Sequence, residues 1–168
     1  MSSKLLSGVI SLFVFLVLVI FVFLALRKQD VVVKDFILPK LFSDDLLFDT
    51  QNLRGETYIV NIFASWCSTC LAEHEFWIKI KKENSDINLY GIDYLDIKEK
   101  AREWLKTNGN PYKDVAFDGN GKMGKHFGLT GVPETFVFGK NGEILLHISG
   151  NVDINQWNSE IKQYVVAN

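Results

Sequence analysis

The sequence is poor in cysteine and carries no excess of charge of either sign. Of its 168 residues only two are cysteine, Cys67 and Cys70, so a zinc site with four cysteine ligands is excluded. The formal net charge is −2, from 18 basic and 20 acidic residues, and this balance gives no indication of a nucleic-acid partner. The sequence has no internal repeat, and its only biased tract is one apolar run near the N-terminus. The remaining length is sufficient for one domain of ordinary size.

Charge is entirely absent from residues 5–26, LLSGVISLFVFLVLVIFVFLAL. About 20 apolar residues cross the hydrocarbon core of a bilayer, and this run contains 22. A cleaved signal peptide has a shorter apolar region and small residues at the cleavage site, where this sequence has Leu24 and Leu26. A buried soluble helix would show a polar face, and this run shows none. We therefore expect residues 1–26 to form an uncleaved, single-pass membrane anchor.

The charges that flank this run do not decide its orientation. Lys4 lies on one side and Arg27 and Lys28 lie on the other, so the positive-inside bias is weak. No second run of comparable length and hydrophobicity follows in the sequence. We interpret residues 27–35 as a short charged tether, and we expect residues 36–168 to form a domain on one face of the membrane.

Strand-like and helix-like segments alternate after residue 35. The segment TYIVNIFA, residues 57–64, is apolar except for Asn61 and indicates a buried strand. The last expected helix begins with Asp153 and Gln156, a variant of the capping box. The other expected elements are a helix over 70–84, a strand over 87–93, a helix over 97–109, a short helix or loop over 121–128, a hairpin over 134–150 with an Asn-Gly turn, and the closing helix over 153–167. This order predicts an α/β fold with a mixed central sheet and helices on both faces.

The two cysteines lie in the segment SWCSTC, between the expected strand and the first expected helix. Free backbone N–H groups and the helix dipole create positive potential at the beginning of a helix, and this potential favours the thiolate form of Cys67. Cys70 lies one turn later, within reach of a mixed disulfide formed at Cys67. The position therefore predicts a reactive dithiol in which Cys67 is the nucleophile and Cys70 is the resolving thiol.

Four other roles for this pair are disfavoured. A structural disulfide would close a very small loop and would constrain the unfolded chain little. A zinc site would combine Cys67, Cys70 and His74, but the sequence offers no evident fourth ligand. Covalent attachment of haem requires histidine at the position of Leu71. A peroxidase would place a Thr-x-x-Cys stretch after a proline, and neither cysteine has one.

Glu73 lies on the same helical stripe as Cys70 and Trp77. A carboxyl group between the resolving thiol and a bulky aromatic side chain is expected to be partly desolvated, which raises its pKa. Such a group suits proton transfer to or from a thiol. The alternative is an exposed glutamate in the first helical turn that complements the helix dipole, and the sequence leaves both open.

Pro133 and Glu134 lie at the beginning of the expected hairpin, in the segment GVPETF. Proline has no N–H to donate in a strand ladder, so Pro133 is expected at the start of the strand, in a turn that can hold a cis peptide bond. Glu134 is expected at the mouth of the same strand, where the alternative to a functional role is a solvated carboxylate.

These segments together resemble the thioredoxin fold and, within it, the membrane-anchored DsbE/CcmG thiol:disulfide interchange proteins of cytochrome c maturation. The resemblance covers about residues 36–165, and GVPETF and GIDY are more specific than Cys-x-x-Cys because general thioredoxins lack both. Many members have proline between the cysteines, where this sequence has Ser68 and Thr69, and this difference bears on the reduction potential. The matching segments are FILPKL, LRGETYIVNIFASWCSTCLAEH, LYGIDYLD, AREWL and FGLTGVPETFVFGKNGEIL.

The resemblance implies a set of site residues. Asn61 stands where general thioredoxins have a buried aspartate, so proton handling would pass to Glu73. Asp93, in GIDY, is a further candidate for proton handling. The full set is a catalytic group of Cys67, Cys70 and Glu73, with a redox-active disulfide between the two cysteines, and a substrate-binding group of Trp66, Pro133 and Glu134, in which Pro133 is the cis-proline that faces the sulfurs.

The resemblance also implies a function and its partners. The protein would be a thiol-disulfide oxidoreductase without a cofactor or metal, anchored in the inner membrane with its catalytic domain in the periplasm. It would reduce disulfides or mixed disulfides of apocytochrome c before haem attachment, together with the haem-ligation machinery, and a DsbD-type transmembrane donor would supply its electrons. The nearest alternative is a general periplasmic reductase similar to TlpA or ResA with other clients. An alternative from another class is a zinc-binding or redox-silent docking module.

Overall fold

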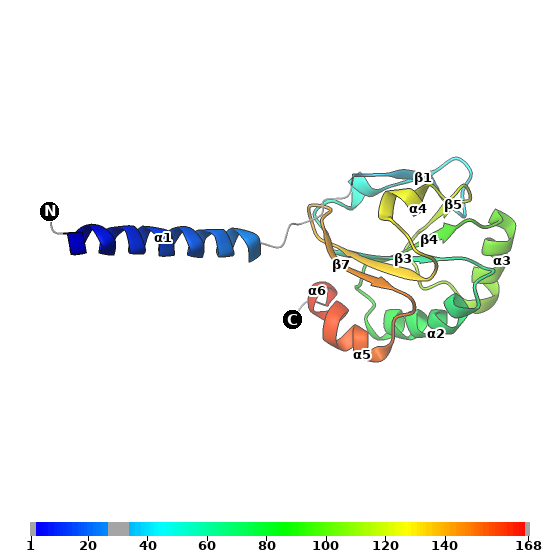
Figure 1. The fold of residues 1–168 in the computed structure, drawn as a ribbon. Helices are drawn as coiled ribbons and strands as arrows, with labels where there is room; N and C mark the ends of the chain where they lie inside the picture. The colour runs from blue at the N-terminus through cyan, green and yellow to red at the C-terminus, as the bar shows by residue number, and fades with distance from the viewer. Residues whose placement is uncertain (1–2, 27–33, 167–168) are drawn as a thin grey trace. The chain divides into compact units, whose positions relative to one another are not determined.

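The fold is described by a computed structural model that covers residues 3–26 and 34–166 (Figure 1). The chain divides into two compact units, residues 1–30 and 31–168. Both cysteines and all the other expected site residues belong to the second unit.

The first unit contains one helix, α1, over Ser3–Leu26. Among the described residues, no helix has the length and apolar character of a membrane span. The expected tether covers residues 27–35, and of these residues 27–33 lie outside the described residues.

The second unit is built on a five-stranded sheet with the order β5-β4-β3-β6-β7. The pairs β3–β4 and β4–β5 are parallel, and the pairs β3–β6 and β6–β7 are antiparallel, which confirms the expected mixed sheet. The strands are β3 over Tyr58–Phe63, β4 over Leu89–Tyr94, β5 over Val115–Asp118, β6 over Glu134–Phe138 and β7 over Ile144–Ser149.

Helices cover both faces of this sheet (Figure 1). On one face lie α2 over Ser68–Glu83, α3 over Lys98–Asn108 and the C-terminal segments α5 over Ile154–Gln156, η2 over Trp157–Ile161 and α6 over Lys162–Val165. On the other face lie α4 over Lys122–Phe127 and a small hairpin of β1 over Ile37–Pro39 and β2 over Leu47–Asp49, which is followed by the 3-10 turn η1 over Thr50–Leu53.

Each face of the sheet has its own apolar core. The core under α2, α3 and the C-terminal segments includes the fully buried Trp77, Ile80, Leu105 and Ile161. The core under α4 and the small hairpin includes Phe48 and a set of aromatic and aliphatic side chains from the strands. A buried side chain of this size stabilises the fold by about 1.5–3 kcal/mol, so these two layers hold the sheet rigidly beneath the cysteine segment.

The central strand β3 has both neighbours and both faces covered, and all six of its residues are buried. A strand in this position is expected to be a continuous apolar run rather than an alternating one, which is what the sequence YIVNIF shows. The exception, Asn61, must therefore find hydrogen-bond partners inside the protein, because a buried amide without partners is costly.

The structure differs from the expected elements in three places. Helix α2 begins at Ser68 rather than at residue 70, because Cys67 caps it. The strand β5 and the hairpin β1–β2 were not predicted, since runs of three or four residues are too short to show a period. The closing helix contains the expected capping box at Asp153 and Gln156, but its middle turn, η2, is π-helical.

Candidate active site

Cys67 lies in the short connection between the end of β3 and the beginning of α2. It is the N-cap of this 16-residue helix, with extended backbone angles of φ −90° and ψ 112°. Its Sγ accepts a hydrogen bond from the backbone N–H of Cys70 at 3.0 Å. In the reduced state a backbone N–H and the positive end of a helix dipole at this position favour the thiolate form of Cys67.

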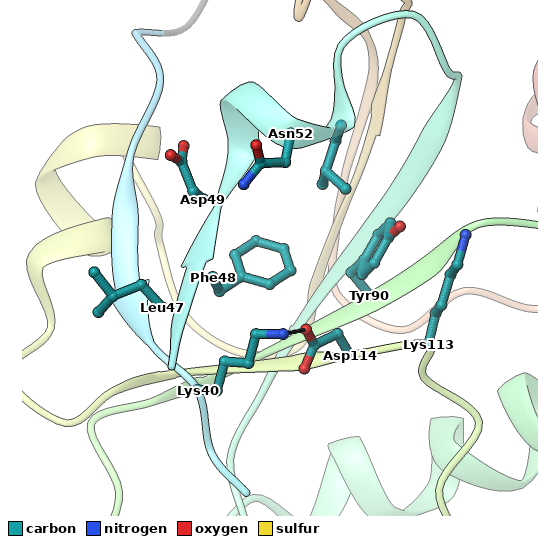
Figure 2. Close-up of a pocket in the computed structure, with 9 residues that line it drawn as sticks. Lys40, Leu47, Phe48, Asp49, Asn52, Tyr90, Lys113 and Asp114 are labelled. Carbon is teal, nitrogen blue, oxygen red and sulfur yellow. Dashed lines mark ion pairs between the residues drawn. The ribbon is translucent and has the colours of Figure 1, made fainter. Parts of the chain in front are cut away.

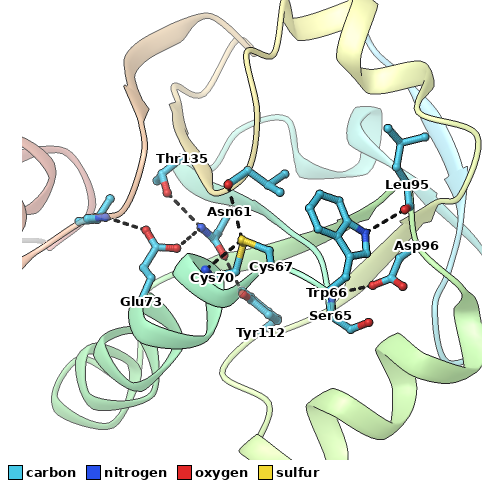
Figure 3. Close-up of a disulfide and its surroundings, with 12 residues drawn as sticks. Asn61, Ser65, Trp66, Cys67, Cys70, Glu73, Leu95, Asp96, Tyr112 and Thr135 are labelled. Atoms are coloured by element: carbon cyan, nitrogen blue, oxygen red, sulfur yellow. Dashed lines mark hydrogen bonds between the residues drawn. A yellow bond between two sulfur atoms is a disulfide. The ribbon is translucent and has the colours of Figure 1, made fainter.

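The two sulfurs are joined in a disulfide, and they differ in their surroundings (Figure 3). Cys67 is 7 % exposed and Cys70 is 2 % exposed, so an incoming sulfur reaches Cys67 first. The carbonyl oxygen of Val132 lies 3.5 Å from Cys67 Sγ, and the Val132–Pro133 peptide bond is cis. The loop before β6 therefore faces the sulfurs through Val132, the residue directly before Pro133.

Glu73 is buried in the second turn of α2, so the exposed alternative is excluded. Its Oε1 accepts a hydrogen bond from the backbone N–H of Val152 at 2.7 Å, and its Oε2 accepts one from Asn61 Nδ2 at 2.8 Å. Burial raises the pKa of Glu73, and the two hydrogen bonds offset part of this effect. The carboxyl group therefore takes up a proton more readily than an exposed glutamate does, and it lies three residues from Cys70 on the same helical face.

Asn61 connects Glu73 to two further buried side chains (Figure 3). Its Oδ1 accepts a hydrogen bond from the hydroxyl of Tyr112 at 2.7 Å, and its Nδ2 also donates to Thr135 Oγ1 at 3.1 Å. Burial raises the pKa of Tyr112 well above its ordinary value, so the phenol keeps its proton and remains a donor. The orientation of the Asn61 amide is fixed by these contacts, and its N–H group is held toward the Glu73 carboxylate.

Asp93 is fully buried near the carboxyl end of β4, beside the end of β3. Within the part of the chain that the structure describes, neither of its carboxylate oxygens has a hydrogen-bond partner. Burial raises the pKa of Asp93 to about 9, and the negative charges of Asp96 and Asp118 add to this effect. Asp93 is therefore protonated at neutral pH and holds a proton inside the domain.

The raised pKa of Asp93 predicts a pH-dependent stability. The unfolded carboxyl titrates near 3.8 and the folded one near 9, so the folded state binds the extra proton between these values. The contribution to the free energy of unfolding is greatest below about pH 4 and falls by at most about 1.4 kcal/mol per pH unit up to about pH 9. In Asp93→Asn, the free energy of unfolding, measured by urea denaturation, is expected not to show this fall over the same pH range.

A matched substitution at an exposed acid, Asp86→Asn, is expected to keep the pH dependence of the wild type. If wild type and Asp93→Asn lose stability in parallel as the pH rises, Asp93 does not hold a proton in the folded state.

Glu134 is buried, so the alternative of a solvated carboxylate at the strand mouth is excluded. Its Oε1 accepts hydrogen bonds from the backbone N–H and the hydroxyl of Thr130 and from the N–H of Gly131, and its Oε2 lies 2.6 Å from His147 Nε2. Burial by itself would raise the pKa of Glu134, but these hydrogen bonds outweigh it and lower the pKa. Glu134 positions the loop that carries Pro133, so it is a positioning residue.

Trp66, directly before Cys67, is 60 % exposed and is the most accessible of the expected site residues. Its indole Nε1 donates a hydrogen bond to the carbonyl oxygen of Leu95 at 3.0 Å. Pro133 is buried against the loop. The structure thus places all the expected site residues near the end of β3. Asp93 pairs with Phe63 and Glu134 pairs with Ile62, so Asp93 lies on the face of the sheet that α2 covers and Glu134 lies on the opposite face.

Several residues of this site were not found from the sequence. Tyr112 and Val152 are 51 and 79 residues from their partners, and no local pattern marks either of them. His147 and Asp96 contact the site from β7 and from the turn after β4. The sequence contains one indication of these residues. Asn61 is a single polar residue in a buried strand, so its amide must have polar neighbours that form hydrogen bonds with it.

The third ligand of the zinc alternative, His74, points away from the sulfurs. Its Nε2 lies 2.8 Å from the carbonyl oxygen of Gly109, and its ring packs 4.4 Å from that of Trp104. Burial lowers the pKa of His74. Among the described residues, no group of three or more His, Cys, Asp or Glu side chains is arranged to hold a metal ion.

A cavity of about 320 Å³ lies beside the small hairpin (Figure 2). An ion pair between Lys40 and Asp114, 2.6 Å apart, crosses its edge. The lining residues are Lys40, Leu47, Phe48, Asp49, Asn52, Leu53, Tyr90, Lys113 and Asp114. None of them is among the residues described around the sulfurs.

Comparison with known proteins identifies the family. Residues 28–164 match the Redoxin family. The thiol:disulfide interchange protein DsbE of Vibrio cholerae is 38 % identical over 125 residues, which cover 74 % of this chain and 67 % of that protein. DsbE of Haemophilus influenzae is 37 % identical over 125 residues, which cover 74 % and 68 %.

Comparison with solved structures identifies the fold. A DsbF homologue from Corynebacterium diphtheriae superposes with a TM-score of 0.71 at 20 % identity, over 82 % of this chain and 88 % of that one. At this identity the likeness concerns the fold alone, and with the Redoxin match it confirms the thioredoxin-like expectation. The chain belongs to the Redoxin family and, within it, to the DsbE family of thiol:disulfide interchange proteins, and it is a thiol-disulfide oxidoreductase.

Proposed function

We propose that this oxidoreductase works as a periplasmic reductant in cytochrome c biogenesis. Its substrates are the disulfides, or mixed disulfides, of apocytochrome c Cys-x-x-Cys-His segments, which must be reduced before haem is attached. The observation that carries this proposal is the partly accessible Cys67 at the N-cap of α2, with the buried carboxyl of Glu73 behind it, in a chain of the DsbE family. This arrangement favours a thiolate at Cys67 and a proton acceptor close to Cys70.

The reaction begins with the reduced protein. The Cys67 thiolate attacks one sulfur of the substrate disulfide, an S–S bond forms between Cys67 and the substrate, and the second substrate sulfur leaves as a thiolate that takes a proton from water. Cys70 then gives its proton to the Glu73 carboxylate and attacks Cys67 Sγ. The Cys67–Cys70 bond forms and the first substrate sulfur leaves as a thiolate. Two electrons have moved from the protein to the substrate.

The thiols must be regenerated by a donor outside the chain. The proposed donor is a transmembrane thiol-disulfide transporter of the DsbD type, which would reduce the Cys67–Cys70 disulfide by the same exchange in reverse. This donor would attack the disulfide at Cys67, the more exposed of the two cysteines. The direction of electron flow is set by reduction potentials, for which about 30 mV corresponds to about 1.4 kcal/mol.

The N-terminal segment is proposed to anchor the domain in the inner membrane, with the catalytic domain in the periplasm. The support is the run of 22 residues without charge and the helix of 24 residues over it. At 1.5 Å per residue this helix is about 36 Å long, compared with about 30 Å for the hydrocarbon core of a bilayer. Extraction with alkaline carbonate tests the anchor, because an integral protein stays in the membrane pellet.

Deletion of the gene, followed by haem staining of c-type cytochromes, tests the proposed function. A strong loss of haem-stained cytochromes is expected, with recovery when the wild-type gene is restored and no recovery with a Cys67→Ser gene. Normal cytochrome levels in the deletion strain would reject the cytochrome assignment.

Trapping of substrates separates this proposal from a general reductase with other clients. In Cys70→Ala the mixed disulfide at Cys67 cannot be resolved, so the bound polypeptide stays attached. Apocytochrome c is expected among the trapped proteins. A set of trapped proteins without any c-type cytochrome would favour a reductase similar to TlpA or ResA.

A further inference from the structure

His147 is a partly exposed histidine on the last strand of the sheet, β7, and its ring contacts a buried carboxylate. Its Nε2 lies 2.6 Å from Glu134 Oε2, and the side chain of His147 is 34 % exposed whereas that of Glu134 is 1 % exposed. In the strand register Glu134 is opposite Ser149, so His147 is its diagonal neighbour on the adjacent strand. This contact therefore joins β7 to the first residue of β6.

The orientation of the His147 ring is set by its neighbour on β6. The ring stacks on that of Phe136, the residue directly opposite in the register, with the centroids 4.1 Å apart and the planes 6° apart. Hydrogen bonds lower the pKa of Glu134, so this carboxyl group is ionised at neutral pH and can only accept. His147 Nε2 is therefore the donor, and it donates to a charged acceptor inside the protein.

The other oxygen of Glu134 holds the loop that precedes β6. This Oε1 accepts from the N–H and the hydroxyl of Thr130, at 2.7 Å and 2.8 Å, and from the N–H of Gly131 at 3.1 Å. The loop continues to Val132, whose carbonyl oxygen lies 3.5 Å from Cys67 Sγ. One carboxylate thus connects the last strand of the sheet with the backbone beside the reactive sulfur.

A second contact from the same end of β7 reaches this loop through the backbone alone. The N–H of Gly150 donates to the carbonyl oxygen of Pro133 at 3.0 Å. This bond holds the residue after Val132, whereas Glu134 holds the two residues before it. A substitution of the His147 side chain does not remove the backbone bond, so it is expected to loosen one of the two attachments and to leave the fold intact.

We propose that His147 is a positioning residue for disulfide exchange with polypeptides. By donating to Glu134 it keeps the carboxylate where it binds the loop, and so it keeps the Val132 carbonyl beside Cys67. A polypeptide joined to Cys67 Sγ lies against this backbone, because the carbonyl is 3.5 Å from the sulfur, whereas a small reagent does not need it. This inference rests on exchange at Cys67 and not on which polypeptide is the client.

Two substitutions separate the N–H of His147 from its ring. His147→Phe keeps an aromatic ring that can stack on Phe136 but has no N–H, and His147→Gln has an N–H but no ring. Ser149→Ala, at an exposed position of the same strand, is the matched control. Stopped-flow kinetics of the reduced full-length protein in detergent, over a range of peptide concentrations, separate the half-saturating concentration from the limiting rate constant. Alkylation by iodoacetamide reports the thiol of Cys67 by itself.

In His147→Phe the half-saturating peptide concentration is expected to rise about tenfold, because the loop that adjoins the bound chain is less firmly held. The limiting rate constant and the alkylation rate are expected to stay within about twofold of the wild type. We expect His147→Gln to restore most of the loss, and Ser149→Ala to behave as the wild type. In a Glu134→Ala background, His147→Phe is expected to add less than about twofold, since the two residues act in one chain of contacts.

Four results would contradict the proposal. Unchanged peptide kinetics in His147→Phe would show that the N–H does not position the loop. A normal His147→Phe with an impaired His147→Gln would assign the role to stacking on Phe136. An equal loss in peptide reduction and in alkylation would place the effect on the thiol of Cys67. A full additional loss in the Glu134→Ala background would show that His147 does not act through Glu134. The comparison of His147→Phe with His147→Gln decides the matter even if Glu134→Ala does not fold.

The choice of peptides keeps this test separate from the cytochrome proposal. One disulfide peptide contains Cys-x-x-Cys-His, and the other has an unrelated sequence around its disulfide. If the wild type reduces only the unrelated peptide, the cytochrome proposal fails, and the variants are then compared on that peptide with the same expected results for His147.

Discussion

Replacing Cys67 by serine is expected to abolish disulfide exchange, with a loss of at least about 10³-fold in the rate constant for reduction of a disulfide peptide. A serine hydroxyl is not ionised at neutral pH and cannot replace sulfur in a mixed disulfide. The N-cap position gives Cys67 its reactivity, because the N–H of Cys70 lies 3.0 Å from its sulfur and the helix dipole adds positive potential. Stopped-flow measurement of the reduced protein with the peptide gives the rate constant.

The companion variant, Cys70→Ser, is expected to behave differently. It keeps the nucleophile, so it forms a mixed disulfide at a rate close to that of the wild type but does not release it. Alkylation with iodoacetamide at neutral pH is expected to modify Cys67 faster than free cysteine. The assignment of the two roles would be reversed if Cys70→Ser lost the rapid alkylation and Cys67→Ser kept it.

Glu73→Gln is expected to slow the second half of the reaction, release of the substrate by Cys70, by about 10²–10⁴-fold. The carboxylate form of Glu73 accepts the Cys70 proton, and burial raises the pKa of this group. In the wild type the release rate should therefore rise as the pH increases through the raised pKa of Glu73. The variant should lack this rise, so its deficit should be greatest at alkaline pH and small at acidic pH.

The loss of a proton acceptor can be separated from a structural effect of the same substitution. Glutamine places an NH2 group against one of the two donors, Val152 N–H or Asn61 Nδ2, at a cost of about 1–3 kcal/mol in stability. A lower melting temperature is thus expected, and the diagnostic measurement is the pH profile. Glu75→Gln, the same change at an exposed position of α2, should leave the melting temperature and the pH profile of the release rate unchanged. A rise with pH that persists in Glu73→Gln would assign the proton to another group.

The features that the sequence predicted correctly depend on neighbours along the chain. The reactive pair was identified because a strand, a connection of a few residues and a helix follow one another, and this places Cys67 at the N-cap. The start of α2 was placed two residues late, because a cysteine sulfur is acting where Ser, Thr, Asp or Asn is the usual cap. The cis peptide bond before Pro133, which the family resemblance implied, is present.

The features that the sequence did not predict depend on contacts between distant residues. Tyr112, Thr135 and Val152 reach the Asn61–Glu73 pair only after the strands are paired, and separations of 51 to 79 residues leave no trace in local periodicity. The short strand β5 was missed for a related reason, since Val115–Asp118 is defined by its pairing with β4.

Glu134 shows that the expected position of a residue in a strand does not tell whether its side chain is buried. It is the first residue of β6, as expected, but it is paired with Ile62 of β3 and Ser149 of β7, so its side chain has a strand on either side. Polar groups that the loop supplies at Thr130 and Gly131 make this burial tolerable. Sequence alone gives no means of foreseeing that a carboxylate will be satisfied by the loop that precedes it.

The strand order has a consequence for how the chain acquires its reactivity during folding. The cysteine segment needs only β3 and α2, which are adjacent in sequence, whereas the Val152 donor to Glu73 and the loop opposite the sulfurs come from residues 130–152. Contacts across such distances form late, because closing long loops is slow. A nascent or partly folded chain therefore presents a thiol pair without its buried acid, and full redox competence arrives only with the last third of the polypeptide.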